Sequence, residues 1–147
     1  MWRHVALVRD GRGDPEAAVA WQRAREGAEK LGNIAAQLDA AEGIARSTRR
    51  IAPAEAIGRY EEALALAARA GDRLREAAIL NTLGILDYER GDYASALRRY
   101  ETGLAMARVR GDRGHEGLML NSIGVTLTRL QRHEEARTAL EIGRAHV

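Results

Sequence analysis

The chain has 147 residues, enough for one domain or a short array of repeats and too few for a multidomain enzyme. Apolar residues make up 46% and charged residues 30%, which excludes a disordered chain, and the absence of cysteine excludes disulfide frameworks, thiolate metal sites and cysteine nucleophiles. A net charge of +2 is a weak basis for nucleic-acid binding, and a composition with no phenylalanine and 4% aromatic residues is typical of packed helices rather than of a β-sandwich or barrel.

The predicted elements are helices separated by glycine, proline and aspartate. Residues 2–9 place Trp2, Val5 and Val8 on one helical face but are too short for a full helix. A helix is predicted over 73–90 and another over 93–110, each preceded by an aspartate suited to the N-cap. The breaks between predicted helices lie at Gly11–Pro15, Gly32-Asn33, Ile51–Pro53, Gly71-Asp72, Gly91-Asp92 and Gly111-Asp112. No apolar run reaches the length of a membrane span and no signal region opens the chain, so we expect a soluble, cytoplasmic protein without membrane contact.

Self-similarity is the strongest signal in the sequence. Residues 40 positions apart match in the second half of the chain, as Asn81 matches Asn121 and Gly84 matches Gly124. A small residue recurs in register as Ala17, Ala56, Ala96 and Ala136, with offsets of 39, 40 and 40. Four copies in register predict a stack of helix pairs, in which these small residues allow the two helices of a pair to cross closely.

The pattern Leu80-x-x-Leu83-Gly84, followed by Gly91-Asp92-Tyr93, Ala96 and Tyr100, and repeated as Leu120-x-x-Ile123-Gly124 with Ala136, resembles the tetratricopeptide repeat. The period of 39 to 40 exceeds the usual length of about 34 residues. Asp87 or Leu127 stands in the place of the family's first-helix tyrosine, and its closing proline is absent. The longer unit resembles the extended repeats of kinesin light chains, cell-polarity adaptors, bacterial peptide-pheromone receptors and large bacterial transcription regulators.

The resemblance implies an all-α fold, a right-handed α-solenoid of antiparallel helix pairs with about seven helices. We expect a single array over residues 1–147, divided into a partial unit 1–32, units 33–71 and 72–111, and a partial unit 112–147. Because both ends fall inside a unit, we expect a fragment of a longer array that self-associates through uncapped ends, around Leu7 and Leu140. Residues 142–147 also resemble a translated sequencing adapter, so their native origin is open.

No catalytic, metal or cofactor site is predicted. The four histidines are not spaced as a pair on one helical face, and a metal site without cysteine needs histidine and carboxylate alone. Gly11-x-Gly13 is no dinucleotide loop, because no strand precedes it and the third glycine is missing. We therefore expect no enzyme activity and no cofactor.

Candidate binding residues come from the resemblance, because the first helix of each unit lines the concave face in this family. The matching positions follow the helical spacing i, i+3, i+7, i+10. They are Ala78, Asn81, Ile85 and Tyr88 in one unit, Leu118, Asn121, Val125 and Thr128 in the next, and Asp39, Glu42, Arg46 and Arg49 in the preceding one, with Arg50 and Arg129 at the margin. If the arginines of the preceding unit face the groove they favour an acidic ligand segment; the alternative is a solvated face.

Asn81 and Asn121 occupy the same position in successive units. An asparagine inside a helix costs roughly half a kcal/mol relative to alanine, and its amide can bond both the N–H and the C=O of an extended backbone. As in family members with asparagine here, we expect the pair to clamp a peptide main chain, so that alanine at both positions weakens binding about five- to a hundredfold. The alternative is that each amide bonds its own helix or a neighbour.

The sequence therefore favours a non-catalytic scaffold that binds an extended peptide or a protein segment on its concave face. The first alternative is a signal-sensing segment of a bacterial transcriptional regulator, which a flanking ATPase or helix-turn-helix domain would indicate. Direct RNA binding is disfavoured. Helical repeats that read RNA have units of about 35 residues and use pairs of polar side chains to read a base, and neither the period nor the single line of asparagines fits them.

Overall fold

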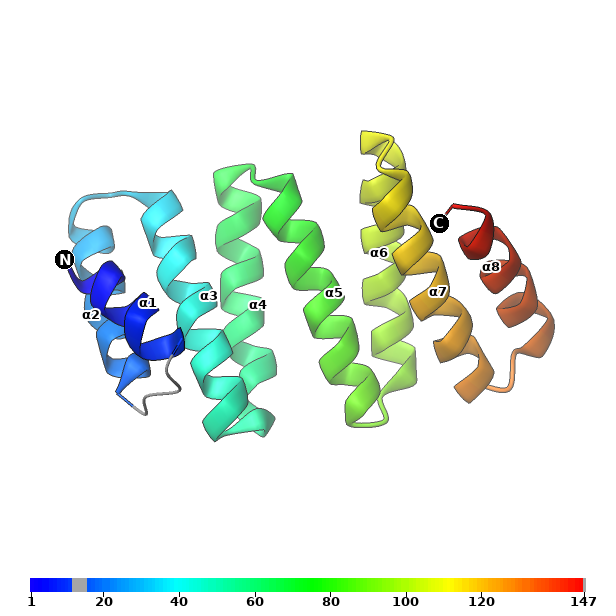
Figure 1. Cartoon of the computed structure of the whole chain (residues 1–147), viewed down its shortest axis with the longest axis horizontal. Helices are drawn as coiled ribbons and strands as arrows, with labels where there is room; N and C mark the ends of the chain where they lie inside the picture. Colours follow the sequence, from blue (N-terminus) through cyan, green and yellow to red (C-terminus); the bar gives the residue numbers. More distant parts are fainter. Residues whose placement is uncertain (12–15, 147) are drawn as a thin grey trace. The chain divides into compact units, whose positions relative to one another are not determined.

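The computed structural model describes residues 1–11 and 16–146, so the predicted break at residues 12–15 lies outside the described part. The described residues form helices and no strand (Figure 1), which confirms the all-α prediction. The helices are α1 (Trp2–Gly11), α2 (Ala17–Lys30), α3 (Ile34–Ile51), α4 (Pro53–Ala70), α5 (Arg73–Glu89), α6 (Tyr93–Arg110), α7 (Arg113–Arg129) and α8 (His133–Ala145).

The first helix departs from the sequence-based expectation. Residues 2–9 were expected to be too short for a full helix, yet α1 has 10 residues. A helix of this length is marginal in water and depends on tertiary packing. Ala6 supplies that packing, because it is fully buried in one core cluster with Trp21 of α2 and Ile44 of α3.

The chain divides into two compact units, Met1–Asp72 with α1 to α4 and Arg73–Val147 with α5 to α8. In the first unit, α3 begins where Asn33 accepts a hydrogen bond from the backbone N–H of Ala36. Helix α4 begins at Pro53, where the missing N–H is not needed, and ends at Gly71 in the left-handed conformation. Both ends agree with the breaks read from the sequence.

In the second unit, α6 has the predicted bounds and α5 ends one residue early, at Glu89. Asp92 caps α6 by accepting from the N–H of Ser95, and Asp112 caps α7 by accepting from the N–H of His115. These backbone hydrogen bonds lower the pKa of both carboxyl groups, since they stabilise the charged form. The core contains Tyr100 and Leu104 of α6, Leu120 and Ile123 of α7, and Ala136 of α8.

The recurrent small residues lie where close packing requires them. Ala17, Ala56, Ala96 and Ala136 are all buried, as the repeat predicts. A Cβ at Gly84 would lie 2.5 Å from Cε1 of Tyr100, so the bare backbone of α5 receives the tyrosine ring of α6. This contact holds the two helices of a pair at short range.

One turn of the second unit is strained. Gly32, Gly71, Gly91 and Gly111 have φ between +63° and +84°, and Gln131, at the position that matches Gly91, has φ 60°. We expect Gln131→Gly to raise the free energy of unfolding by about 0.5–1 kcal/mol, because glycine adopts this conformation without steric cost. Urea unfolding followed by circular dichroism measures the change.

The control for this prediction is Gln131→Ala, which removes the contact of Gln131 with His133 but keeps the left-handed strain. Alanine is expected to give no gain. Equal stability of the glycine and alanine variants would show that the turn stores no strain.

Candidate ligand-binding site

One pocket of the second unit, named the α5–α7 pocket, is lined in part by predicted groove residues. It has a volume of about 270 Å³ and is lined by Tyr88 of α5, Tyr100 of α6, and Leu118, Asn121, Ser122, Val125 and Thr126 of α7. Four of these, Tyr88, Leu118, Asn121 and Val125, are among the residues selected from the sequence. The three that belong to α7, Leu118, Asn121 and Val125, lie on one face of the helix because they recur at i, i+3 and i+7.

The pocket combines apolar walls with a buried aromatic ring. Leu118 is 47% exposed and Val125 is 48% exposed, which leaves two aliphatic side chains partly open to solvent. Tyr100 is buried, and this burial raises the pKa of its hydroxyl to about 12. The hydroxyl is therefore neutral at physiological pH and contributes no charge to the pocket.

Asn121 offers its amide to this pocket. Among the residues that the structure describes, none bonds its side chain, and the residue is exposed. The neighbouring hydroxyls differ, because Thr126 donates to the carbonyl of Ser122 and Thr128 donates to the carbonyl of Gly124. The side-chain donors and acceptor of Asn121 thus have no partner among the described residues.

One lining residue of the pocket, Tyr88, contacts a second tyrosine and an arginine that do not line it. The ring of Tyr88 meets that of Tyr93 edge to face, with 5.2 Å between centroids. The Tyr88 hydroxyl accepts a hydrogen bond of 2.9 Å from Nε of Arg129. This hydrogen bond raises the pKa of Arg129, so the guanidinium remains charged.

Four predicted groove residues lie on α5 or at the end of α7 without lining the pocket. Ala78 is exposed and Asn81 is half-buried. Ile85 is half-buried and packs against the core. Thr128 is exposed, with its hydroxyl bonded to its own helix. Tyr100, Ser122 and Thr126 were not selected from the sequence, although they line the pocket.

The predicted groove residues on α3 of the first unit are charged, and they pair with other residues of the same unit. Asp39 accepts from Nε of Arg3 at 2.8 Å, and Nε of Arg46 lies 2.7 Å from a carboxylate oxygen of Asp10 in α1. Arg50 donates to the backbone carbonyl of Asp10, and Arg49 also has a partner. The expected cationic groove is thus largely neutralised by α1, which removes the basis for an acidic preference at α3.

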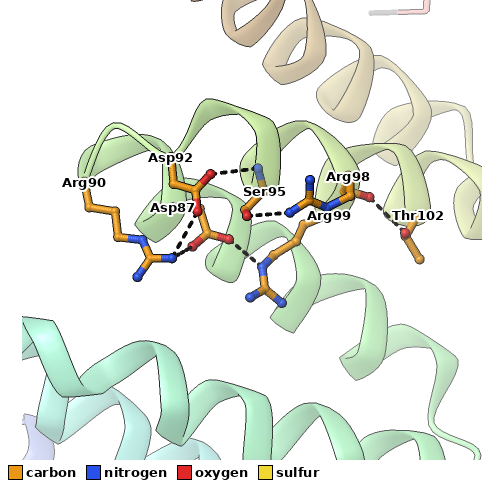
Figure 2. A network of polar contacts seen from close by, with 7 residues as sticks. All are labelled: Asp87, Arg90, Asp92, Ser95, Arg98, Arg99 and Thr102. Carbon is orange, nitrogen blue, oxygen red and sulfur yellow. Dashed lines mark hydrogen bonds and ion pairs between the residues drawn. The ribbon is translucent and has the colours of Figure 1, made fainter.

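A buried ion pair fixes the geometry of α5 against α6 beside the pocket (Figure 2). Asp87 is fully buried and accepts a hydrogen bond of 2.6 Å from Nε of Arg99, which is 20% exposed at its side chain. Its other carboxylate oxygen lies 3.2 Å from Arg90 without an aligned hydrogen bond. The pair ties α5 to α6 at the turn of α5 that also carries Tyr88.

Residues 1–11 and 16–146 contain no group of three or more histidine or carboxylate side chains placed to hold a metal ion. None of their helices is long and apolar enough to cross a membrane.

The comparisons with known proteins agree with this architecture. The family model of the tetratricopeptide repeat matches residues 52–108. BtubC (BKLC) from P. vanneervenii shares the fold with a TM-score of 0.84 and 21% identity, over 99% of this chain and 61% of that one. A signal transduction ATPase with numerous domains and a tetratricopeptide repeat sensor, from Pyrococcus horikoshii, has a TM-score of 0.86 and 18% identity, over 99% of this chain and 23% of that one. No curated protein matches the chain.

Residues 52–108 thus match the tetratricopeptide repeat, and the chain shares the α-solenoid fold of the two structures. It spans 61% of the length of BtubC and 23% of the length of the archaeal ATPase. At these identities the likeness to the two structures concerns the fold.

Proposed function

We propose that the chain is a non-catalytic interaction module that binds an extended peptide segment through the α5–α7 pocket. The tetratricopeptide repeat fold is typical of protein-interaction scaffolds, which supports a protein partner. The observation that carries the proposal is the amide of Asn121, which bonds none of the described residues and lies between two exposed aliphatic side chains, Leu118 and Val125.

The chemistry of the pocket suits a peptide main chain with one apolar side chain. Burying an aliphatic side chain against Leu118, Val125 and the ring of Tyr100 contributes about 1.5–3 kcal/mol. The Asn121 amide accepts from a backbone N–H and donates to a backbone C=O, which positions the peptide without regard to its sequence. Specificity then comes from the pocket, and orientation from the asparagine.

We expect Asn121→Ala to weaken peptide binding about two- to tenfold, because one to two net hydrogen bonds are lost. The fold should be unchanged, since Asn121 is exposed and bonds no described residue. Val125→Arg is expected to abolish binding by placing a charge in the pocket. Isothermal titration with a peptide selected from a display library measures both effects, and circular dichroism checks the fold.

The matched control is Val109→Arg on α6, which makes the same substitution at a side chain that is 91% exposed and does not line this pocket. It should bind as the parent chain does. If Val125→Arg and Asn121→Ala bind as tightly as the control, ligand binding does not use the α5–α7 pocket.

A signal-sensing segment of a larger regulator is the second candidate. It is favoured by the likeness to an archaeal signal transduction ATPase that carries a tetratricopeptide repeat sensor, of which the chain covers 23%. Sequencing the gene beyond both ends of the chain tests it. An adjoining ATPase or DNA-binding domain would support the regulator, and an array of further repeats alone would support a scaffold.

A further inference from the structure

Another pocket of the second unit, named the α6 pocket, contains a buried donor without an acceptor. It has a volume of about 340 Å³ and is lined by Arg73 of α5 and by Thr102, Ala105, Met106, Val109 and Arg110 of α6. These residues are different from those that line the α5–α7 pocket. We propose that the α6 pocket binds a small, uncharged and mainly apolar molecule, whose carbonyl oxygen accepts a hydrogen bond from Arg110.

The body of the ligand is defined by the wall of the pocket. Ala105, Met106 and Val109 share one face of α6, because they lie one and four residues apart. Ala105 is exposed and Val109 is 91% exposed, so this apolar wall is accessible from solvent. The hydroxyl of Thr102 donates to the carbonyl of Arg98 at 2.9 Å, so its proton is used within the helix. A volume of about 340 Å³ is at the lower end of the range of small-molecule sites, which indicates a small apolar body.

The polar contact comes from the guanidinium of Arg110. Its Nη2 donates a hydrogen bond of 2.6 Å to Asp112, the residue that caps α7. Its Nη1 is buried and has no hydrogen-bond partner among the residues that the structure describes. A buried N–H without an acceptor costs free energy, which a ligand oxygen recovers. An oxygen carried by an apolar molecule suits this position better than a water molecule, because a buried water needs several polar partners and the wall is apolar.

The charges at the pocket favour a neutral ligand. Both arginines that line it pair with a carboxylate, Arg110 with Asp112 at 2.6 Å and Arg73 with Glu76 at 2.7 Å. A ligand carboxylate would therefore place an unbalanced negative charge against the apolar wall, and removing that charge from water is costly. The site needs one acceptor and no further charge. A ketone or ester carbonyl meets this requirement.

Three probes that differ in one group test the class of ligand. Benzylacetone carries a ketone, butylbenzene has a methylene in place of the carbonyl, and hydrocinnamate has a carboxylate in place of the methyl ketone. Each is titrated into the whole chain with isotope-labelled methionine methyl groups. We expect benzylacetone to give a saturable shift of the Met106 methyl signal and hydrocinnamate to bind several-fold more weakly. The absence of a saturable shift with benzylacetone, or tighter binding of hydrocinnamate, would overturn the inference.

The role of Arg110 is tested by the ratio of the affinities for benzylacetone and butylbenzene. This ratio should fall about two- to tenfold in Arg110→Met, because the donor to the carbonyl is lost. The matched control is Arg73→Met, the same change at the other arginine of the pocket, which should leave the ratio unchanged. An unchanged ratio in Arg110→Met, or an equal fall in both variants, would show that Arg110 does not bind the carbonyl.

A blocking variant covers the case in which Arg110→Met disturbs the α7 cap. Ala105→Trp places a ring over the wall at an exposed position, so it should remove the benzylacetone shift while circular dichroism stays unchanged. Glu101→Trp, at an exposed position of α6 that does not line the pocket, is the control and should bind as the parent chain does. Benzylacetone binding that survives Ala105→Trp would overturn the inference. Peptide binding at the α5–α7 pocket uses other residues, so the two proposals fail separately.

Discussion

Replacement of Gly84 by alanine is expected to lower the free energy of unfolding of the second unit by about 1–3 kcal/mol. The added Cβ would lie 2.5 Å from Cε1 and 2.8 Å from Cζ of Tyr100, distances that real Cβ contacts do not show. The ring has little room to retreat, because Tyr100 is 3% exposed and packs in the core. Valine at this position should be worse, since it adds two further carbons at the same contact. Urea unfolding at constant temperature measures both.

The matched control is Gly114→Ala on α7, in the same unit, where the nearest atom to an added Cβ is an Asp112 carboxylate oxygen at an ordinary 3.7 Å. This change should be neutral or slightly stabilising, because alanine is the better helix former. Combining Gly84→Ala with Tyr100→Leu should cost less than the sum of the single changes, since the clash is then relieved. Equal effects of Gly84→Ala and Gly114→Ala would contradict close packing of α5 on α6.

Asp87→Asn is expected to destabilise the second unit by about 2–4 kcal/mol. The change removes the carboxylate charge that pairs with Arg99, whose side chain is 20% exposed, and weakens the hydrogen bond between them. The expected loss is less than for a fully buried partner, because solvent reaches part of the guanidinium. Thermal and urea unfolding of the variant measure the loss.

The chain itself supplies the compensating variant. At an offset of 40, Leu127 and Ala139 stand where Asp87 and Arg99 stand, and both are buried. Asp87→Leu combined with Arg99→Ala copies this apolar pair and should restore most of the stability, since well-packed apolar residues replace buried ion pairs at little cost. A double variant as unstable as Asp87→Asn would show that the ion pair is required for the fold.

The sequence predicted several helix boundaries well because local chemistry marks them. The aspartates Asp92 and Asp112 bond the first turns of α6 and α7, and glycines at positive φ end α4 and α6. Gln131 breaks the pattern, since a residue other than glycine takes the left-handed turn there. Local signals did not show α1, because that helix depends on the packing of Ala6 against other helices.

Part of the pocket lining was selected from the sequence. The family resemblance gave Leu118, Asn121 and Val125, which share a face of one helix. Tyr100 was not selected, because its place in the pocket depends on how α6 lies beside α7. The pairing of Arg46 with Asp10 depends on the placement of α1 and cannot be read from α3.

The two leucines expected to be exposed at the ends of the array differ in their burial. Leu140 was expected to expose an apolar end, but it is half-buried and packs against Gly124 of α7. Leu7 is 42% exposed on α1. Self-association through either terminal helix stays a prediction. Light scattering over a range of concentrations measures it.

The proposed binding of peptide at the α5–α7 pocket is tested most directly by a nuclear magnetic resonance titration of the isotope-labelled whole chain with a display-selected peptide. We expect the largest amide shifts to cluster at Leu118, Asn121, Val125 and Tyr88, and the side-chain amide of Asn121 to shift with them. Shifts that instead centre on the outer residues of α6 or α8, with the Asn121 amide unmoved, would contradict it.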